Sequence, residues 1–74
     1  MKINELKDRL ITENIDPRKY SFFENNEGDC MVLLHKKVYW EIYYTERGEI
    51  FDKKIFLSEN KACNVFYNLV KDMK

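Results

Sequence analysis

The side chains that could do chemistry are few and scattered along this chain. His35 is the single histidine, and a metal or acid–base site would need partners such as Cys30 or Glu41 brought close to it in space. Ser21 and Ser58 lie in no recognisable nucleophile motif, no glycine-rich phosphate loop occurs, and the carboxylates are dispersed. A lone histidine at the end of a strand is more often solvated than catalytic. We therefore expect no enzymatic activity, no catalytic residue, no metal site and no cofactor.

Length and composition limit the chain to one small domain. A chain of 74 residues buries only about 60% of the surface that its unfolded form exposes, so its core must be compact. The residues are 45% hydrophobic and 35% charged, with one proline and two glycines, which excludes disordered and low-complexity classes. Thirteen basic and thirteen acidic side chains cancel, which argues against the positive field that dominates non-specific nucleic-acid binding.

The sequence also indicates a compartment. The first ten residues carry charges where a secretory signal would need an apolar run, and no later stretch approaches the ~20 apolar residues of a membrane span. Cys30 and Cys63 show neither a disulfide framework nor a metal-type spacing, so we interpret them as buried free thiols. We expect a cytoplasmic protein with no membrane association.

The densest run of aromatic and β-branched residues spans residues 38–45 and predicts a central strand. Successive side chains of a strand point to opposite faces, so this run separates into two sets. The set expected to face the core is Val38, Trp40, Ile42 and Tyr44. The set on the other face is Tyr39, Glu41, Tyr43 and Thr45.

Two amphipathic helices should flank the predicted sheet. Asn4 is a suitable N-cap for the first, in which Leu6 and Leu10 recur at helical spacing, and this helix should stop near Asn14. Ser58 is a suitable N-cap for the second, which has an apolar stripe over four turns. The stripe consists of Ala62, Cys63, Phe66, Leu69, Val70 and Met73.

Further strands are expected before the central one. A turn at Asp16-Pro17, in which Asp16 acts as a cap, should lead into a brief edge strand over residues 20–23. Residues 24–29 form a polar, acidic loop with Glu24, Glu27 and Asp29. Residues 30–35 are apolar on both parities, which is typical of a strand covered on both sides or facing a partner surface.

A hairpin should follow the central strand. Gly48 can adopt the left-handed conformation that closes a loop of three to five residues. Residues 50–57 then fit an edge strand blunted by charge, and a bulge would explain its broken alternation. We predict a single α+β domain over residues 1–74, with an antiparallel sheet of three to four strands between N- and C-terminal helices, in the order α-(β)-β-β-β-α. The expected core includes Leu6, Leu10, Val38, Trp40, Ile42, Phe66 and Leu69.

Two helices on one side of such a sheet leave its other face without cover. That face should carry an aromatic and aliphatic patch larger than a soluble monomer usually shows. Tyrosine at the centre with charged residues at the rim is the composition of a protein interface, although a homodimer through this face would satisfy the same physics. The predicted partner-binding residues are Tyr39, Glu41, Tyr43, Glu46, Arg47 and Glu49.

Single-stranded nucleic acid is the alternative partner. Aromatic residues on a sheet can stack bases while neighbouring lysines contact phosphates. The residues available for this are Tyr39, Tyr43, Lys36, Lys37, Lys53 and Lys54. The neutral charge and the absence of an RNP-like motif argue against this interpretation.

Three stretches, residues 40–48, 56–59 and 62–67, resemble small immunity proteins of bacterial polymorphic-toxin systems, including contact-dependent growth inhibition. The opening helix around Leu6 and Leu10, and Ile15-Asp16-Pro17 followed by Tyr20, belong to the same pattern. The resemblance implies a cytosolic protein without enzymatic activity. Such a protein neutralises one cognate toxin, often a nuclease, by covering or distorting its active site.

The charge of this chain departs from one part of that pattern. Immunity proteins against basic nucleases are often strongly acidic, whereas this chain is formally neutral. The class of toxin therefore stays open. Acidic groups in residues 24–29, and at Glu41, Glu46 and Glu49, could still supply local complementarity and faster association.

Overall fold

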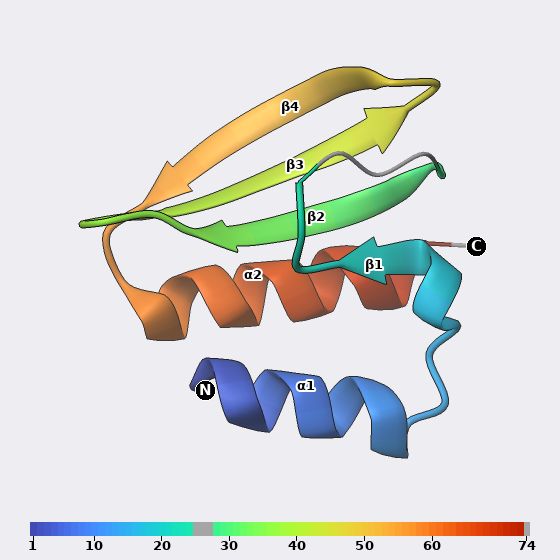
Figure 1. Ribbon diagram of the computed structural model, residues 1–74. Coiled ribbons are helices and arrows are strands. Elements are labelled where there is room, and N and C mark those ends of the chain that lie inside the picture. Colours follow the sequence, from blue (N-terminus) through green and yellow to red (C-terminus); the bar gives the residue numbers. More distant parts are fainter. Residues whose placement is uncertain (25–27, 74) are drawn as a thin grey trace.

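The chain folds as two helices and a four-stranded sheet (Figure 1). The computed structural model describes residues 1–24 and 28–73, so the predicted acidic loop lies partly outside the described residues, Glu27 included. The helices are α1 (Ile3–Thr12) and α2 (Glu59–Asp72), with a short 3-10 helix at Pro17–Lys19. The strands are β1 (Tyr20–Ser21), β2 (Cys30–His35), β3 (Trp40–Glu46) and β4 (Glu49–Phe56). The predicted α+β class and order are confirmed.

The strands follow one another across the sheet in the order β1-β2-β3-β4. β2 pairs with β3, and β3 with β4, in antiparallel orientation, as the sequence predicted. β1 is the exception, because it pairs in parallel with β2 through Tyr20↔Met31 and Ser21↔Val32.

The central strand starts two residues later than predicted. The Lys36 N–H donates to the Tyr39 carbonyl at 2.8 Å, which closes the β2–β3 connection and leaves Val38 within it. Val38 is 77% exposed, so its assignment to the core was wrong. Trp40 is 8% exposed and belongs to the core as predicted. The His35 ring stacks on the Trp40 indole, with centroids 4.0 Å apart.

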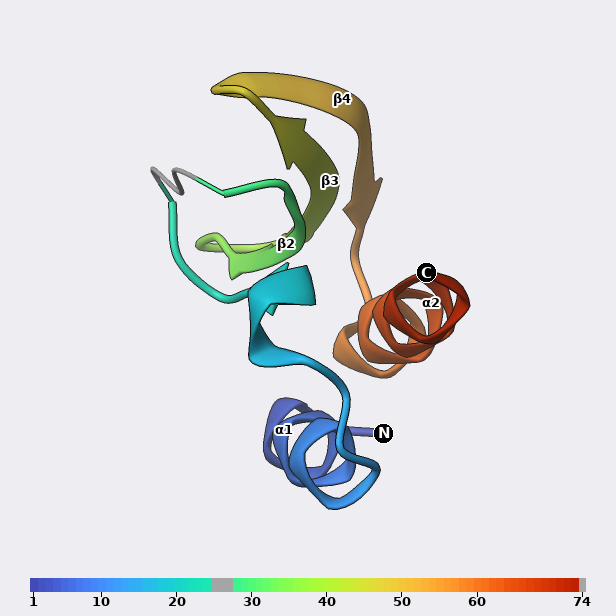
Figure 2. The same cartoon turned by 90° about the vertical axis from the view of Figure 1, so that its right-hand side faces the viewer.

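The main core lies between the sheet and α2. The Ser58 hydroxyl accepts a hydrogen bond from the Lys61 N–H at 3.2 Å, which confirms Ser58 as the N-cap of α2. The predicted stripe of α2 faces the sheet, with Leu69 and Met73 half-buried at its margin. Figures 1 and 2 show that α2 covers the sheet, while α1 packs on α2 and lies farther from the strands. The buried members of this core include Leu6, Leu10, Met31, Leu33, Trp40, Ile42, Ala62, Cys63, Phe66 and Val70.

The two ends of α1 are stabilised in different ways. Asn4 lies inside the helix and is not its cap; the carboxylate of Glu59 in α2 accepts a hydrogen bond from the Ile3 N–H at 2.9 Å instead. At the other end, Asn14 has a left-handed backbone with φ of 56°. Its N–H and the next one, of Ile15, donate to carbonyls of the last helical turn at 3.0 Å each, which is a Schellman ending.

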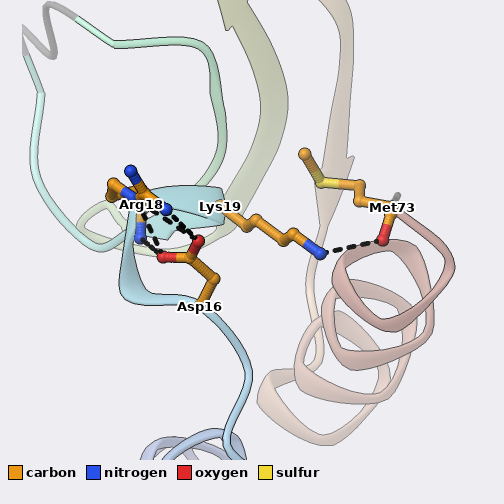
Figure 3. A network of polar contacts seen from close by, with 4 residues as sticks. All are labelled: Asp16, Arg18, Lys19 and Met73. Carbon is orange, nitrogen blue, oxygen red and sulfur yellow. Dashed lines mark hydrogen bonds and ion pairs between the residues drawn. The ribbon is translucent and has the colours of Figure 1, made fainter.

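The connection after α1 is held by its own polar contacts (Figure 3). The Asp16 carboxylate caps the 3-10 helix by accepting from the Arg18 N–H at 2.9 Å, and the Arg18 guanidinium lies 2.8 Å from the same carboxylate. These hydrogen bonds lower the pKa of Asp16 to about 2. Lys19 Nζ donates to the Met73 carbonyl at 3.2 Å, so this connection is tied to the end of α2.

Candidate interaction surface on the sheet

The sheet face opposite α2, called the outer face below, is largely buried. It carries a small hydrophobic cluster of its own, which consists of Cys30, Val32, Leu34 and Tyr43. Tyr43 is only 6% exposed and Glu41 only 3%, so the expectation of an open aromatic patch at these residues was wrong. The strands curl, and the described ends of the β1–β2 segment lie on this side of the sheet (Figure 2). The Thr45 hydroxyl, for example, donates to the Gly28 carbonyl at 3.4 Å.

A chain of alternating charges crosses the outer face. The Glu41 carboxylate, whose side chain is 4% exposed, lies 2.7 Å from Lys53 Nζ and 3.6 Å from Lys36 Nζ. Lys36 also reaches Glu24 at 2.6 Å. The hydrogen bond to Glu24 raises the pKa of Lys36, and the hydrogen bond to Glu41 raises that of Lys53. Both lysines therefore stay charged, and both ammonium groups lie within ion-pair distance of the buried carboxylate.

These residues line a pocket of about 210 Å³ over β2, β3 and β4. Its walls include Leu34, Tyr43 and Ile50 besides the four charged side chains. Two positive and two negative groups balance within it, so the pocket offers hydrogen bonds and apolar contact but no net field. Such an arrangement can hold a side chain of a partner.

The β3–β4 turn is tighter than predicted. Arg47 and Gly48 both have positive φ, 52° and 81°, and Glu46 pairs directly with Glu49, so the loop has two residues. The Arg47 N–H donates to the Asp29 carboxylate at 3.1 Å, which anchors the turn to the residue before β2. The side chains of Glu46, Arg47 and Glu49 are exposed at this tip.

β4 carries the predicted bulge. Ile42 pairs with Lys54 and Tyr44 with Phe51, so two residues of β4, Asp52 and Lys53, face the single Tyr43 of β3. Asp52 has φ of 54°, a left-handed conformation that aspartate tolerates better than most residues.

β4 is also the most exposed element of the sheet, since only Phe56 is partly covered. Large apolar side chains are exposed along it and directly after it. They are Ile50, Phe51, Ile55 and Leu57, at 55%, 41%, 54% and 84%.

No family model, no curated protein and no solved structure matches this chain. Its surface must therefore be interpreted from its own chemistry. Across residues 1–24 and 28–73, no three His, Cys, Asp or Glu side chains are grouped so that they could hold a metal ion. In the same residues, no helix is long and apolar enough to cross a membrane.

The structure divides the predicted site residues into three places. Glu46, Arg47 and Glu49 are together and exposed at the hairpin tip, whereas Glu41 and Tyr43 form the floor of the outer face. Tyr39 is half-buried just before β3, seven residues from Glu46, which is a distance of about 23 Å along an extended strand.

Sequence reasoning missed the network of Glu24, Lys36, Glu41 and Lys53 and the exposed apolar residues of β4. The acidic and basic residues were visible as separate groups, but only the strand register brings them together. The apolar residues at positions 50, 51 and 55 could have been found from their mixed parity, which leaves some of them without a core to face.

Proposed function

We propose that this chain is an immunity protein, which binds a cognate bacterial toxin in the cytoplasm and neutralises it through protein–protein contact. The observation that carries this proposal is the set of exposed apolar side chains on β4, with Ile50 and Ile55 on the outer face and Phe51 on the helix-facing side. Ile50, Phe51 and Ile55 are each 41–55% exposed on one eight-residue strand. Large apolar side chains gathered on the surface of a small domain are typical of sites that meet another protein.

The surroundings of β4 fit a protein partner better than a nucleic acid. Glu46, Arg47 and Glu49 at the adjacent tip supply the polar, charged rim that interfaces carry around an apolar centre. Two of the lysines that could contact phosphates, Lys36 and Lys53, are instead paired with carboxylates. A phosphate backbone would have to compete with Glu24 and Glu41 for them.

The proposed action involves no chemical step by this chain. The inhibitor would place β4 and the hairpin tip over or beside the toxin's active site, so that substrate cannot enter. Inhibition then depends on the affinity of the complex. The substrate of the toxin, whether or not it is a nucleic acid, does not bind this chain. The complex only keeps it out of the toxin's active site.

Co-expression with the product of the adjacent toxin gene tests the proposal. The wild-type chain should restore growth, and a stable complex should form when the two purified proteins are mixed. The double variant Ile50→Ser, Ile55→Ser should lose protection, because it removes two exposed apolar contacts while leaving the buried core intact. Ile11→Ser is the matched control, since Ile11 is 69% exposed on α1.

Two results would contradict the proposal. One is the absence of both protection and complex formation with the wild-type chain. The other is tight binding of a single-stranded oligonucleotide with a steep salt dependence, which would indicate phosphate contacts as the main source of affinity.

A further inference from the structure

The edge of β4 that is not paired with β3 is the longest unpaired strand edge in the described part of the chain. The strand order leaves β1 and β4 at the two sides of the sheet, and β1 has only two residues whereas β4 has eight. An edge strand exposes backbone N–H and C=O groups that can pair with another chain. Proteins usually protect such edges with bulges and lysines, and β4 has both, at Asp52 and at Lys53-Lys54.

This protection is incomplete beyond the bulge. Lys53 Nζ forms an ion pair with Glu41, 2.7 Å away on the outer face. Its charge therefore does not protect the strand edge from pairing with another chain. Lys54 lies on the helix-facing side, opposite Ile42, and forms no ion pair with any described residue. From Lys54 to Phe56 the strand pairs regularly with β3. Ile55 and the following Leu57 are 54% and 84% exposed.

We propose that an extended segment of the toxin adds to the sheet along this stretch of β4. The segment carries an acidic side chain opposite Lys54 and apolar side chains against Ile55 and Leu57. Main-chain hydrogen bonds supply affinity in this mode of recognition, and the side chains supply specificity. This inference rests on the proposed function and specifies how the partner binds.

A second copy of this chain fits the edge poorly. The sequence Ile-Phe-Asp-Lys-Lys-Ile-Phe at positions 50–56 is nearly self-complementary around Lys53, and an antiparallel copy would set Asp52 against Lys54. However, the bulge shifts the alternation, so that Phe51 pairs on the helix-facing side with Tyr44 while Ile55 pairs on the outer side with Glu41. Opposed residues in a sheet must point to the same face. An antiparallel copy centred on Lys54 avoids this conflict, but it sets Lys54 of one chain directly opposite Lys54 of the other.

The test is a titration of the purified product of the adjacent toxin gene with the wild-type chain and two charge-reversed variants. Lys54→Glu should weaken binding by at least about tenfold, because it sets like charges opposite each other across the strand pair. Lys61→Glu is the matched control, because Lys61 is exposed on α2 and should bind like the wild type. Hydrogen exchange should slow at the backbone amides of residues 53–57 when the complex forms.

The possible outcomes separate this inference from the proposed function. If the wild type binds but Lys54→Glu binds equally well and the β4 amides exchange at unchanged rates, the edge is not used although the immunity function stands. If the wild type does not bind, both proposals fail. If the chain alone forms a dimer that Lys54→Glu disrupts, the edge belongs to a second copy and the inference is wrong.

Discussion

Glu41 and Lys53 form an ion pair in which the carboxylate is buried and the ammonium group is half-exposed, with 2.7 Å between Oε1 and Nζ. Lys36 is the second cation of this carboxylate but lies farther away, at 3.6 Å. Lys53→Met should therefore destabilise the fold by about 1–2 kcal/mol, since breaking a buried pair leaves a charge uncompensated but Lys53 itself is partly solvated. Urea denaturation measures the change.

A second substitution tests the cause of that loss. Combining Lys53→Met with Glu41→Leu removes both charges, so the double variant should regain much of the lost stability. Equal losses in the single and double variants would show that the loss does not come from an uncompensated Glu41 charge, since Met keeps most of the aliphatic stem of Lys53.

Trp40 should dominate the stability of the core. It is 8% exposed between the sheet and α2, so Trp40→Ala should cost about 3–5 kcal/mol, which is comparable with the whole stability of a small domain. Val38→Ala is the control on the same segment, because Val38 is 77% exposed and should change the melting temperature little. Similar effects of the two substitutions would contradict the observed start of β3.

Asp16 should make stability depend on acid pH. Its pKa is lowered from 3.8 to about 2 in the folded state, chiefly by the hydrogen bond from Arg18, so its stabilising effect is present above the unfolded value. That effect is lost as the pH falls through the folded pKa, because the unfolded chain binds the proton first. The difference in urea midpoint between wild type and Asp16→Asn should be constant at neutral pH and shrink between about pH 4 and pH 2.

Other carboxylates also make the stability depend on pH in the acid range. Comparing the wild type with Asp16→Asn separates their effect from that of Asp16. The pKa of Glu13 is lowered by the Tyr67 hydroxyl, and that of Glu24 by Lys36. Both act in the wild type and in the variant alike. A difference that stays the same down to pH 2 would show that the Asp16–Arg18 contact does not form in solution.

Arg47 allows backbone and side-chain roles to be separated. Its backbone N–H donates a hydrogen bond to the Asp29 carboxylate. Its φ is 52°, a conformation that asparagine adopts readily. Arg47→Asn should therefore keep the hairpin and the melting temperature. If the side chain is an anchor of the proposed complex, the same variant should bind the toxin about 2 kcal/mol more weakly, while Glu49→Ala should mainly change the association rate and its salt dependence. Unchanged affinity of Arg47→Asn would restrict Arg47 to its role in the turn.

The local patterns of the sequence were sufficient to predict most elements. The stripe of α2 and its Ser58 cap depend on residues close in sequence, as does the alternation around Trp40 and Ile42. The bulge also left a local signal, because residues 50–56 lack a clean alternation of apolar and polar side chains.

The errors have a common physical origin in contacts between distant residues. Tyr43 and Glu41 were expected on an open face, but Lys36 and Lys53 pair with Glu41. Tyr43 packs in the small cluster with residues of β2. The cap of α1 comes from Glu59, at the far end of the chain, so no inspection of residues near Asn4 could have found it. Because such contacts bury the centre of β3, the candidate site lies on the neighbouring edge strand β4 instead.

The hydrogen bond from Ile3 to Glu59 spans 56 positions of sequence and has a consequence for how the chain folds during synthesis. α1 is ten residues long, and a helix of that length is only marginally stable by itself in water. It is synthesised before α2, so it meets its capping carboxylate and its packing partner only after α2 has been made. Stable formation of α1 therefore depends on its contacts with α2. A nascent chain in which α2 has not yet been made therefore has no completed core.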